Sequence, residues 1–317
     1  MSNNSKMKST LKSDDVEEWL DLKIVRPLGY LWTLFFNKLN VHPNTVTVLS
    51  MIIGGASGFF LSKRADTTEG LIYNIIGVLL IMWANLYDSA DGQLARMTGK
   101  KTRLGRILDG AAGDIWFFSI YVGLAVRLFP QTIPFTTIQW SWWAFLLMAV
   151  SGFLCHSRQA NLADYYRQAH LFFQKGAANS ELDNYLQQKA LYDQARWSDD
   201  VIWKFFLFTY VRYTKVQEAQ TPEFQKLMAT VKKAYPKEMP QALRDDFRAH
   251  SLPLIKYVNM LSFNTRAIVL YICCLIDMPY IYPLFEIIVL MSMFFHMRSS
   301  HEKFCKQLRQ NVEAGKY

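Results

Sequence analysis

The sequence predicts an all-α protein that crosses a membrane several times. Its 317 residues are 51% hydrophobic, yet the mean hydropathy is only +0.03, because apolar blocks alternate with polar ones. A helix needs roughly 20 predominantly apolar residues to cross a bilayer. Six segments approach that length, and a soluble protein would bury one or two such helices rather than six. The predicted transmembrane helices lie near residues 44–62, 70–91, 107–129, 140–157, 257–276 and 280–298.

The segment ahead of the first predicted span, residues 14–38, mixes acidic residues with Trp19, Trp32 and Phe35. This mixture is typical of an amphipathic helix that lies in the membrane interface, and it favours that interpretation over a soluble surface helix. The first ten residues are polar, so we expect no cleaved signal peptide.

A long charged segment separates the fourth predicted span from the fifth. It is helical in pattern, and its most apolar part, residues 201–213, is too short to cross a bilayer. We therefore expect a cytoplasmic helical insertion. The expected organisation is an N-terminus with the interfacial helix, four membrane helices, the insertion, and two membrane helices with a cytoplasmic tail, at residues 1–43, 44–158, 159–250 and 251–317.

The positive charges of the short loops predict the orientation. Five Lys and Arg residues lie between residues 96 and 106, whereas the turn after the third helix has only Arg127 and the turn after the fifth has none. Because cytoplasmic loops carry an excess of Lys and Arg, this bias places both termini in the cytoplasm. Lys63 and Arg64, after the first helix, are a weak contrary signal. We expect a cell inner membrane.

The cysteines and the net charge narrow the class of protein and its expected partners further. The four cysteines lie inside or beside apolar runs without metal-ligand spacing, which predicts reduced packing residues rather than a disulfide frame. The formal charge of +9 comes largely from the predicted cytoplasmic loops and tail. It therefore fits anionic lipid headgroups as partners better than nucleic acid.

Four carboxylates lie in NLYDSADGQLARMTGKKTRLGRILDGAAGDIWFF, the stretch that joins the second and third apolar runs. Asp88 and Asp91 are spaced i, i+3 and share a helix face, while Asp109 and Asp114 begin the next helix. Such acids are costly at the edge of a membrane and repel one another unless a cation lies between them. Oxygen ligands without His or Cys suit Mg²⁺, Mn²⁺ or Ca²⁺. Pairing with the arginines of the same stretch is the alternative.

Small residues and an arginine accompany these acids. Gly92 and Ala95 leave room for a ligand to approach the backbone, Arg96 can meet an anion, and Gly105 is small where the next helix begins. Small residues, metal-type acids and an arginine together indicate a phosphate site, whose chemistry depends on positioning and on neutralising phosphoryl charge.

At these positions the chain resembles the CDP-alcohol phosphotransferase family. The pattern of that family is D-x2-D-G-x2-A-R-x8-G-x3-D-x3-D, and the stretch from Asp88 to Asp109 follows it with the same spacing. Pro43 and Asn44, at the head of the first predicted span, resemble the Pro-Asn opening of the family. The resemblance covers the six predicted spans and excludes residues 159–250.

One position departs from the pattern, which requires its last aspartate at position 113. This chain has Gly113 followed by Asp114, and on a regular helix Asp114 lies about 140° around the axis from Asp109. A one-residue π-bulge would turn Asp114 back toward the other acids, and Gly110 and Gly113 favour such a distortion. A site with three acids is the alternative.

The resemblance implies a role for each matched residue. Asp88, Asp91, Asp109 and, provisionally, Asp114 would ligate Mg²⁺ or Mn²⁺, two ions in all, and Asp114 would also take the proton of the acceptor alcohol. The residues Gly92, Ala95, Arg96 and Gly105 would hold the cytidine nucleotide. The reaction implied is transfer of a phosphatidyl or phospho-alcohol group from a CDP-linked donor to an alcohol, with release of CMP. A homodimer is also implied.

The substrates and two further residues stay open. Arg158 and Arg266 resemble arginines of the family near the same places and would bind a phosphate, but Arg is also common at such helix ends. A CDP-diacylglycerol donor is favoured, with inositol, inositol phosphate, glycerol phosphate or serine as the acceptor. The alternatives are a CDP-ethanolamine or CDP-choline donor with a lipid acceptor, a non-catalytic relative, and a divalent-cation transporter, for which Glu286 is the nearest acid within another span.

Overall fold

The structure is a computed structural model, and it describes residues 15–176, 180 and 182–317. The described residues are helical throughout apart from loops and one isolated β-bridge, between Thr132 and Gln139, which confirms the all-α prediction. The helices form two compact units. The first contains the described residues up to Ser157 together with Asn264–Ile288, and the second contains Arg158–Phe263 and Val289–Tyr317.

Five helical runs in the described part of the chain are long and apolar enough to cross a membrane. They are Pro43–Leu61, Thr68–Thr98, Arg103–Leu128, Gln241–Leu275 and Ile281–Glu313. The segment predicted as the fourth span is helical but is not among the five, because tryptophans at its start and His156 at its end shorten its apolar part. The sixth crossing therefore stays a prediction.

The segment predicted as the fifth span is divided into two helices. α12(Ile255–Met260) ends at a turn, and α13(Phe263–Leu275) starts after it. Thirteen residues span about 20 Å, less than the roughly 30 Å of a hydrocarbon core. The predicted span near 257–276 nevertheless falls largely within the run Gln241–Leu275, which is long and apolar enough to cross a membrane, and a turn at Leu261 and Ser262 interrupts that run.

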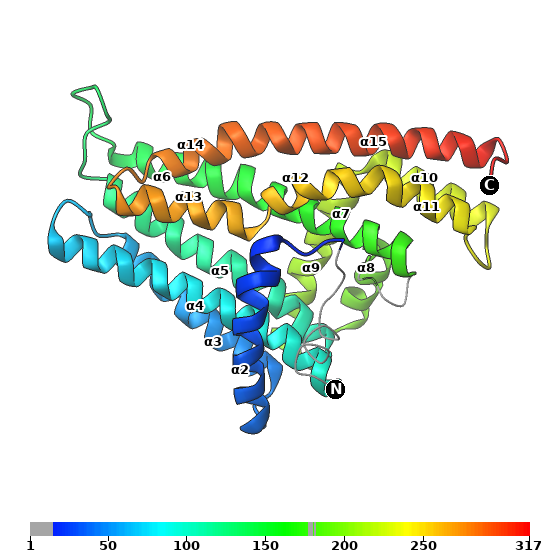
Figure 1. Cartoon of the computed structure of the whole chain (residues 1–317), viewed down its shortest axis with the longest axis horizontal. Coiled ribbons are helices and arrows are strands. Elements are labelled where there is room, and N and C mark those ends of the chain that lie inside the picture. Colours follow the sequence, from blue (N-terminus) through cyan, green and yellow to red (C-terminus); the bar gives the residue numbers. More distant parts are fainter. Residues whose placement is uncertain (1–14, 177–179, 181) are drawn as a thin grey trace. The chain divides into compact units, whose positions relative to one another are not determined.

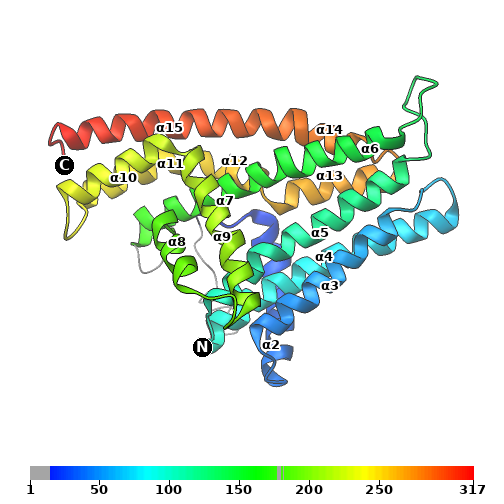
Figure 2. The same cartoon turned by 180° about the vertical axis from the view of Figure 1, so that it is seen from behind.

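Three helices form the centre of the first unit and run side by side in Figures 1 and 2: α3(Pro43–Leu61), α4(Thr68–Thr98) and α5(Arg103–Leu128). Local signals fix their ends. Thr67 and Thr102 cap α4 and α5 by accepting hydrogen bonds from the backbone N–H groups of Gly70 and Gly105. Gly99 ends α4 with φ +70°, a conformation that favours glycine.

Small residues let α3 and α5 pack backbone against backbone. A Cβ atom added at Gly58 would lie 2.3 Å from the carbonyl oxygen of Ser119, and one added at Gly123 would lie 2.1 Å from the carbonyl oxygen of Gly58. The Ser119 hydroxyl donates to the Gly55 carbonyl at 2.5 Å, and the Trp116 indole donates to the Ser50 carbonyl at 2.9 Å. Close approach through small residues is how membrane helices gain packing energy without a hydrophobic driving force.

A buried arginine ties four helices together at the far end of α5. Arg127 is 2% exposed, and its guanidinium donates to the carbonyl oxygens of Leu61 and Cys274, to Asn74 at 2.7 Å and to Asp277 at 2.6 Å. Asp277 also pairs with Arg64 at 3.3 Å. Arg127 and Arg64 were both counted as loop charges in the orientation argument, and both pair with acids, Arg127 with Asp277 and Arg64 with Asp277 and Asp66.

The remaining helices of the first unit are short and complete the packing. The N-terminal part forms η1(Asp21–Val25) and α2(Arg26–Lys38), and α2 packs on α4. The exposed face of α2 is apolar, with Leu31 and Phe35 at least half exposed, but its position in a membrane interface stays a prediction. The other elements are α6(Ser141–Ala149), the π-helical η2(Val150–His156), α13, α14(Ile281–Phe285) and the π-helical η5(Glu286–Leu290).

The second unit is helical, as expected for the insertion. Its aromatic core includes Phe173 stacked on Phe247 with ring centroids 3.7 Å apart, and α10 packs along α15. A cytoplasmic location for this unit stays a prediction. Its helices are α7(Ser157–Lys175), α8(Tyr185–Gln194), α9(Val201–Gln220), α10(Pro222–Ala234), α11(Gln241–Ser251), the 3₁₀ turn η4(Leu252–Leu254), α12 and α15(Met291–Glu313).

The glycine contact between α3 and α5 gives a testable prediction. Replacement of Gly58 by Val places methyl groups against the backbone of Ser119, and overpacking of this kind costs about 1–3 kcal/mol or more. We expect Gly58→Val to lower the thermal unfolding midpoint of the purified protein clearly. The matched control is Gly55→Val on the same helix, where an added Cβ meets only a methyl group of Ile115 at 3.8 Å. Equal midpoints for the two variants would contradict the close packing.

The Arg127 cluster gives a second prediction. Arg127→Met removes the closest donor to Asp277 and the Arg127 hydrogen bonds to two backbone carbonyl groups, and breaking a buried ion pair costs about 3–5 kcal/mol. We expect the free energy of unfolding to fall by an amount near the lower end of this range, because the Asp277 side chain is 18% exposed. Arg64→Met is the control, since the Arg64 side chain is 49% exposed and such pairs contribute below about 1 kcal/mol. Denaturant unfolding of both variants measures the difference.

The Arg127 cluster also makes the stability of the fold depend on pH. Partial burial is the largest single influence and acts to raise the pKa of Asp277, but the hydrogen bonds and positive charge of Arg127, with the hydrogen bonds from the Ala65 backbone and from Arg64, together outweigh it and lower the pKa. The stabilisation by this carboxylate is therefore present above its unfolded-state pKa of about 3.9 and is lost as the pH falls through the lower folded-state value. Arg127→Met should reduce this part of the acid sensitivity, while the hydrogen bonds from the Ala65 backbone N–H and from Arg64 to Asp277 remain.

Candidate functional site

Three of the four predicted acids meet where α4 ends and α5 begins. Asp88 and Asp91 are one turn apart on α4, and Asp109 lies on the second turn of α5. Only residues 99–102 separate α4 from α5. The chain turns within these four residues, and Gly99 adopts the left-handed conformation there. One carboxylate oxygen from each of the three acids lies within 4.8 Å of the others. The structure thus gathers acids that are up to 21 positions apart in the sequence.

The environment of these acids suits a divalent cation. Asp91 is 4% exposed, and within the described part of the chain its Oδ2 is buried without a hydrogen-bond partner. Asp88 is half-buried and Asp109 is exposed, so the group is open on one side. A buried carboxylate oxygen without a donor is costly, and three like charges repel. A hard cation with oxygen ligands would remove both penalties, and we conclude that these residues fit such an ion.

The small residues of the motif lie against polar side chains. At Gly92 an added Cβ would lie 3.3 Å from Nη1 of Arg96, so the guanidinium folds over this glycine. At Gly105 an added Cβ would lie 2.7 Å from Oδ1 of Asn44, which brings the first turn of α3 to the first turn of α5. The Asn44 backbone N–H donates to Nδ1 of His42 at 3.2 Å, which caps α3. Ala95 and Arg96 are half-buried.

Asp114 is not part of the acid group. α5 is a regular α-helix from Arg103 to Leu128, so the expected π-bulge near Gly110 and Gly113 was wrong. The physical reason is that nothing lies within 4 Å of a Cβ built at either glycine, and no neighbour forces an extra residue into the turn. On a regular helix Asp114 points about 140° away from Asp109, toward a different face of α5.

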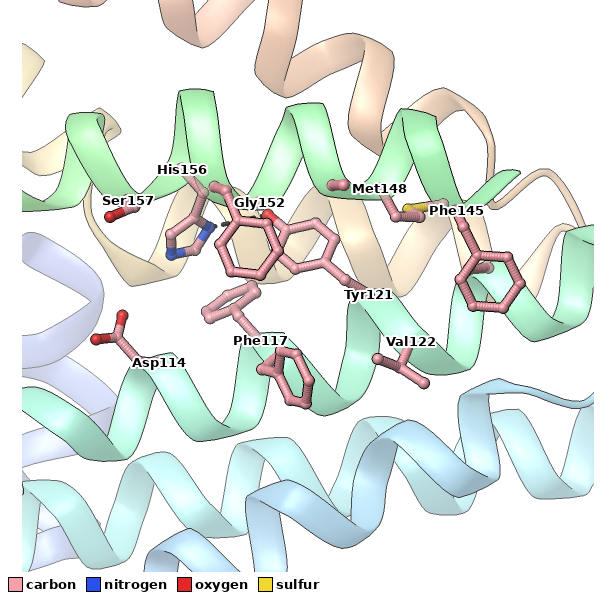
Figure 3. Close-up of a pocket in the computed structure, with 13 residues that line it drawn as sticks. Asp114, Phe117, Tyr121, Val122, Phe145, Met148, Gly152, His156 and Ser157 are labelled. Carbon is pink, nitrogen blue, oxygen red and sulfur yellow. Dashed lines mark hydrogen bonds between the residues drawn. The ribbon is translucent and has the colours of Figure 1, made fainter. Parts of the chain in front are cut away.

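That face of α5 borders a pocket, shown in Figure 3. The pocket lies between α5 and the α6–η2 segment and has a volume of about 440 Å³. Its polar residues gather at one end, where Asp114, His156 and Ser157 come together in Figure 3. Phenylalanines, Val122 and Met148 line the rest.

A buried glutamate lies behind the wall of this pocket. Glu286 is fully buried, and Arg266 donates to its Oε1 at 2.5 Å. The Tyr282 hydroxyl donates to Oε1 at 2.7 Å, and Oε2 accepts from Ser151 at 2.5 Å and from Tyr121. Every oxygen of the carboxylate is therefore occupied, and the charges of Glu286 and Arg266 balance each other.

His156 connects this buried network to the pocket. Its Nδ1 lies 3.0 Å from the Tyr121 hydroxyl, 3.1 Å from Oε1 of Glu286 and 3.1 Å from Nη1 of Arg266. All of these contacts use Nδ1, so Nε2 is the ring nitrogen left for the pocket. In Figure 3 the imidazole of His156 lies on the opposite wall from Asp114. Sequence reasoning singled out neither His156 nor Tyr121, although Glu286 in an apolar segment was a usable signal.

The two arginines predicted to bind phosphate have different surroundings. Arg266 is 1% exposed, and its guanidinium is paired with Glu286. Arg158 begins the second unit, on the first turn of α7, and is exposed. Only Arg158 is therefore available to solvent, and the structure gives Arg266 a buried ionic partner that sequence reasoning did not pair with it.

A second group of metal-type residues lies in the second unit. His301, Glu302 and Cys305 each offer an atom within 4.8 Å of the others. Nδ1 of His301 is 3.5 Å from the Cys305 sulfur, and the imidazole stacks on Tyr166 with centroids 3.7 Å apart. An S–H···N hydrogen bond and an aromatic stack thus fix the position of His301, and the group belongs to a different unit from the three aspartates. The four cysteines all lie in the described part of the chain, are buried and form no disulfide, as expected.

Comparisons with known proteins bear on the first unit and on the start of the second. The family model described as CDP-alcohol phosphatidyltransferase matches residues 40–176, a range that contains the acid group, the small residues and the pocket. A protein of Aquifex aeolicus (strain VF5), described as an uncharacterized protein, is 34% identical over 104 residues. These residues are 33% of this chain and 42% of that protein, so the chain spans less than half the length of this curated relative. No solved structure matches the chain.

The motif and the family model agree on position. The residues from Asp88 to Asp109 follow the pattern of the family, and they lie in the middle of the matched range. Asn44, which contacts Gly105, lies near the start of that range. Residues 40–176 of this chain therefore match the CDP-alcohol phosphatidyltransferase family model, the family that the motif resembles.

Proposed function

We propose that the chain transfers a phosphatidyl or phospho-alcohol group from a CDP-linked donor to an alcohol and releases CMP. One observation carries the proposal: Asp88, Asp91 and Asp109 converge from two helices inside the matched domain, with ligand atoms within 4.8 Å of one another. Phosphoryl transfer depends on positioning and on neutralising charge, and a metal held by these acids beside Arg96 would supply both.

The acids would hold Mg²⁺ or Mn²⁺, two ions by resemblance to the family. When bound, the metal neutralises charge on the pyrophosphate of the donor. The oxygen-only donor set and the unpartnered Oδ2 of Asp91 support a hard cation over Zn²⁺. Gly92, Ala95, Arg96 and Gly105 would hold the nucleotide, since the Arg96 guanidinium lies where an anion can be met and the glycines leave the backbone accessible.

Asp114 would serve the acceptor rather than the metal. Its carboxylate faces the pocket on another side of α5, and a carboxylate near a hydroxyl can take its proton. Arg158 is retained as a candidate phosphate-binding residue because it is exposed. Arg266 is a weaker candidate, because its charge is already balanced by Glu286 at 2.5 Å.

The sequence favours CDP-diacylglycerol as the donor and a polar alcohol as the acceptor, among them inositol, inositol phosphate, glycerol phosphate and serine. A CDP-ethanolamine or CDP-choline donor with a lipid acceptor is the second possibility, and the apolar pocket beside Asp114 is the observation that favours it. We also propose an inner-membrane location with the site facing the cytoplasm, a homodimer, and contact with anionic lipids.

Cation transport and a non-catalytic role are weaker proposals. A cation path needs acids that bind and release ions, whereas the carboxylate of Glu286 is fully engaged by Arg266, two tyrosines and a serine. Uptake of Mn²⁺ into proteoliposomes would support transport. Metal binding without CMP release would support a non-catalytic relative.

Metal binding can be measured without turnover. A ligand at 100 times its dissociation constant stabilises the folded state by about 2.7 kcal/mol, so saturating Mg²⁺ should raise the unfolding midpoint of the wild-type protein. We expect Asp91→Asn to abolish this shift and Asp114→Asn to retain it. The control is Asp66→Asn, which changes an exposed acid outside the group. Loss of the shift in Asp114→Asn would return Asp114 to the ligand set.

The reaction itself is tested by CMP release from purified protein with Mg²⁺. We would supply CDP-diacylglycerol, then CDP-ethanolamine, against a panel of alcohols, and we expect CMP with one pair. Asp91→Asn should lower the rate by about 100-fold or more, the scale on which loss of one strong electrostatic contact slows an enzyme. Protein that binds Mg²⁺ and releases no CMP with any pair would refute the proposed reaction.

A further inference from the structure

The metal-type side chains of α15 lie close together outside the acid group. His301 and Cys305 are spaced i, i+4, and Glu302 and Cys305 are spaced i, i+3, so each pair shares a face of the helix. One ligand atom from each of the three residues lies within 4.8 Å of the others. The group lies in the second unit, whereas the three aspartates of the acid group lie in the first, and nothing in the proposed function uses it.

The distances within the group match the separations expected between ligands of a tetrahedral zinc ion. Nδ1 of His301 lies 3.5 Å from the sulfur of Cys305 and 3.6 Å from Oε1 of Glu302. Zinc binds nitrogen and oxygen at about 2.0–2.1 Å and sulfur at about 2.3 Å. At tetrahedral angles these bond lengths place nitrogen about 3.5 Å from sulfur and about 3.4 Å from oxygen. One Zn²⁺ ion therefore fits between the three atoms with only small movements of the side chains.

Buried polar atoms of this region lack partners. Within the described part of the chain, Oε1 of Glu302, Nε2 of His301 and the hydroxyl of Tyr166 are buried without a hydrogen bond. Buried polar atoms are nearly always paired in native proteins, and an exception calls for an explanation such as an ion or a water molecule. A cation bound at Oε1 removes the cost of burying that oxygen. The Glu302 side chain is 15% exposed, which gives the ion access from solvent.

The surrounding side chains hold two of the ligands in place. The imidazole of His301 stacks on Tyr166 with ring centroids 3.7 Å apart, and the ring of Phe304 meets it edge-on at 4.8 Å. Oε2 of Glu302 accepts a hydrogen bond of 2.7 Å from the backbone N–H of Glu223, in the first turn of α10. This bond orients the carboxylate and leaves Oε1 on the side of His301. Outer contacts that fix the ligands in this way are typical of metal sites.

We propose that His301, Glu302 and Cys305 bind one Zn²⁺ ion through Nδ1, Oε1 and the sulfur, with water as the fourth ligand. The thiol of Cys305 releases its proton to solvent when the Zn–S bond forms, and this bond replaces the S–H···N hydrogen bond to His301. Thiolate and imidazole ligands select zinc over Mg²⁺ and Mn²⁺, which prefer oxygen. The ion links α15 to α10 through Glu302 and so stabilises the second unit, independently of the proposed reaction.

Metal binding is measured first, on the full chain purified in detergent without a histidine tag. The protein is dialysed against Zn²⁺ with excess Mg²⁺, which occupies the acid group, and the unbound ions are then removed. Elemental analysis should give one zinc ion per chain. With Co²⁺ in place of Zn²⁺, we expect the visible absorption of tetrahedral cobalt together with a thiolate charge-transfer band in the near ultraviolet. Zinc-free protein, or cobalt without the thiolate band, would overturn the site.

Two matched pairs of variants locate the ion. Cys305→Ala and His301→Gln each remove a ligand and should lower the zinc affinity by about 100-fold or more, since loss of an outer contact alone costs about 10–100-fold. The controls are Cys273→Ala, a buried free cysteine of the first unit, and His296→Gln, an exposed histidine earlier on α15. Both controls should bind zinc as the wild type does. Equal affinities in all four variants would refute the site.

Two further variants guard against misfolding and against binding at the acid group. Glu302→Gln keeps an oxygen for the N–H of Glu223 and removes only the charge, so it should fold and still bind zinc more weakly. Asp91→Asn should keep the rise in unfolding midpoint that saturating Zn²⁺ produces, whereas Cys305→Ala should lose it. Zinc binding that is lost in Asp91→Asn and kept in Cys305→Ala would place the ion at the acid group and overturn the inference.

Discussion

Charge buried among apolar helices must be balanced, and this constraint organises the first unit. An isolated ion in a low-dielectric medium carries a large desolvation penalty, so each ionisable side chain there needs a partner or a ligand. Arg127 meets Asp277 at 2.6 Å at one end of α5. Glu286 meets Arg266 at 2.5 Å beside the pocket. Further hydrogen bonds from protein groups complete both pairs. The pairs therefore stabilise the fold without a bound ligand or ion.

The acid group follows a different pattern, and this difference is what marks it as a site. Asp88, Asp91 and Asp109 bring like charges together, and Oδ2 of the buried Asp91 has no hydrogen-bond partner among the described residues. Proteins tolerate such an arrangement where a cation completes it. The close contact of Gly105 with Asn44 keeps the first turns of α3 and α5 together, so packing by small residues also serves the geometry of the site.

The two faces of α5 give a physical picture of how a donor and an acceptor can be kept apart. Asp109 faces the acids of α4, while Asp114 lies about 140° around the helix and opens into the pocket. In the function that we propose, one regular helix would thus present one carboxylate to a metal-bound nucleotide and another to an alcohol. The shift of the last motif aspartate by one position changes the face it serves, and it does not by itself imply a disabled site.

The sequence by itself determined the helical class, most of the apolar runs and the motif residues, because hydropathy and fixed motif spacing are local properties. It also placed Asp88, Asp91 and Asp109 on adjoining helix ends, since the short turn at Gly99 leaves few alternatives. Only the tertiary structure decided the rest. The partner of Arg266, the burial of Arg127 and the position of His156 beside the pocket depend on contacts between residues 20 to 150 positions apart, and no local pattern encodes them. The face of Asp114 was decided by the regular geometry of α5, which glycines in the sequence left undetermined.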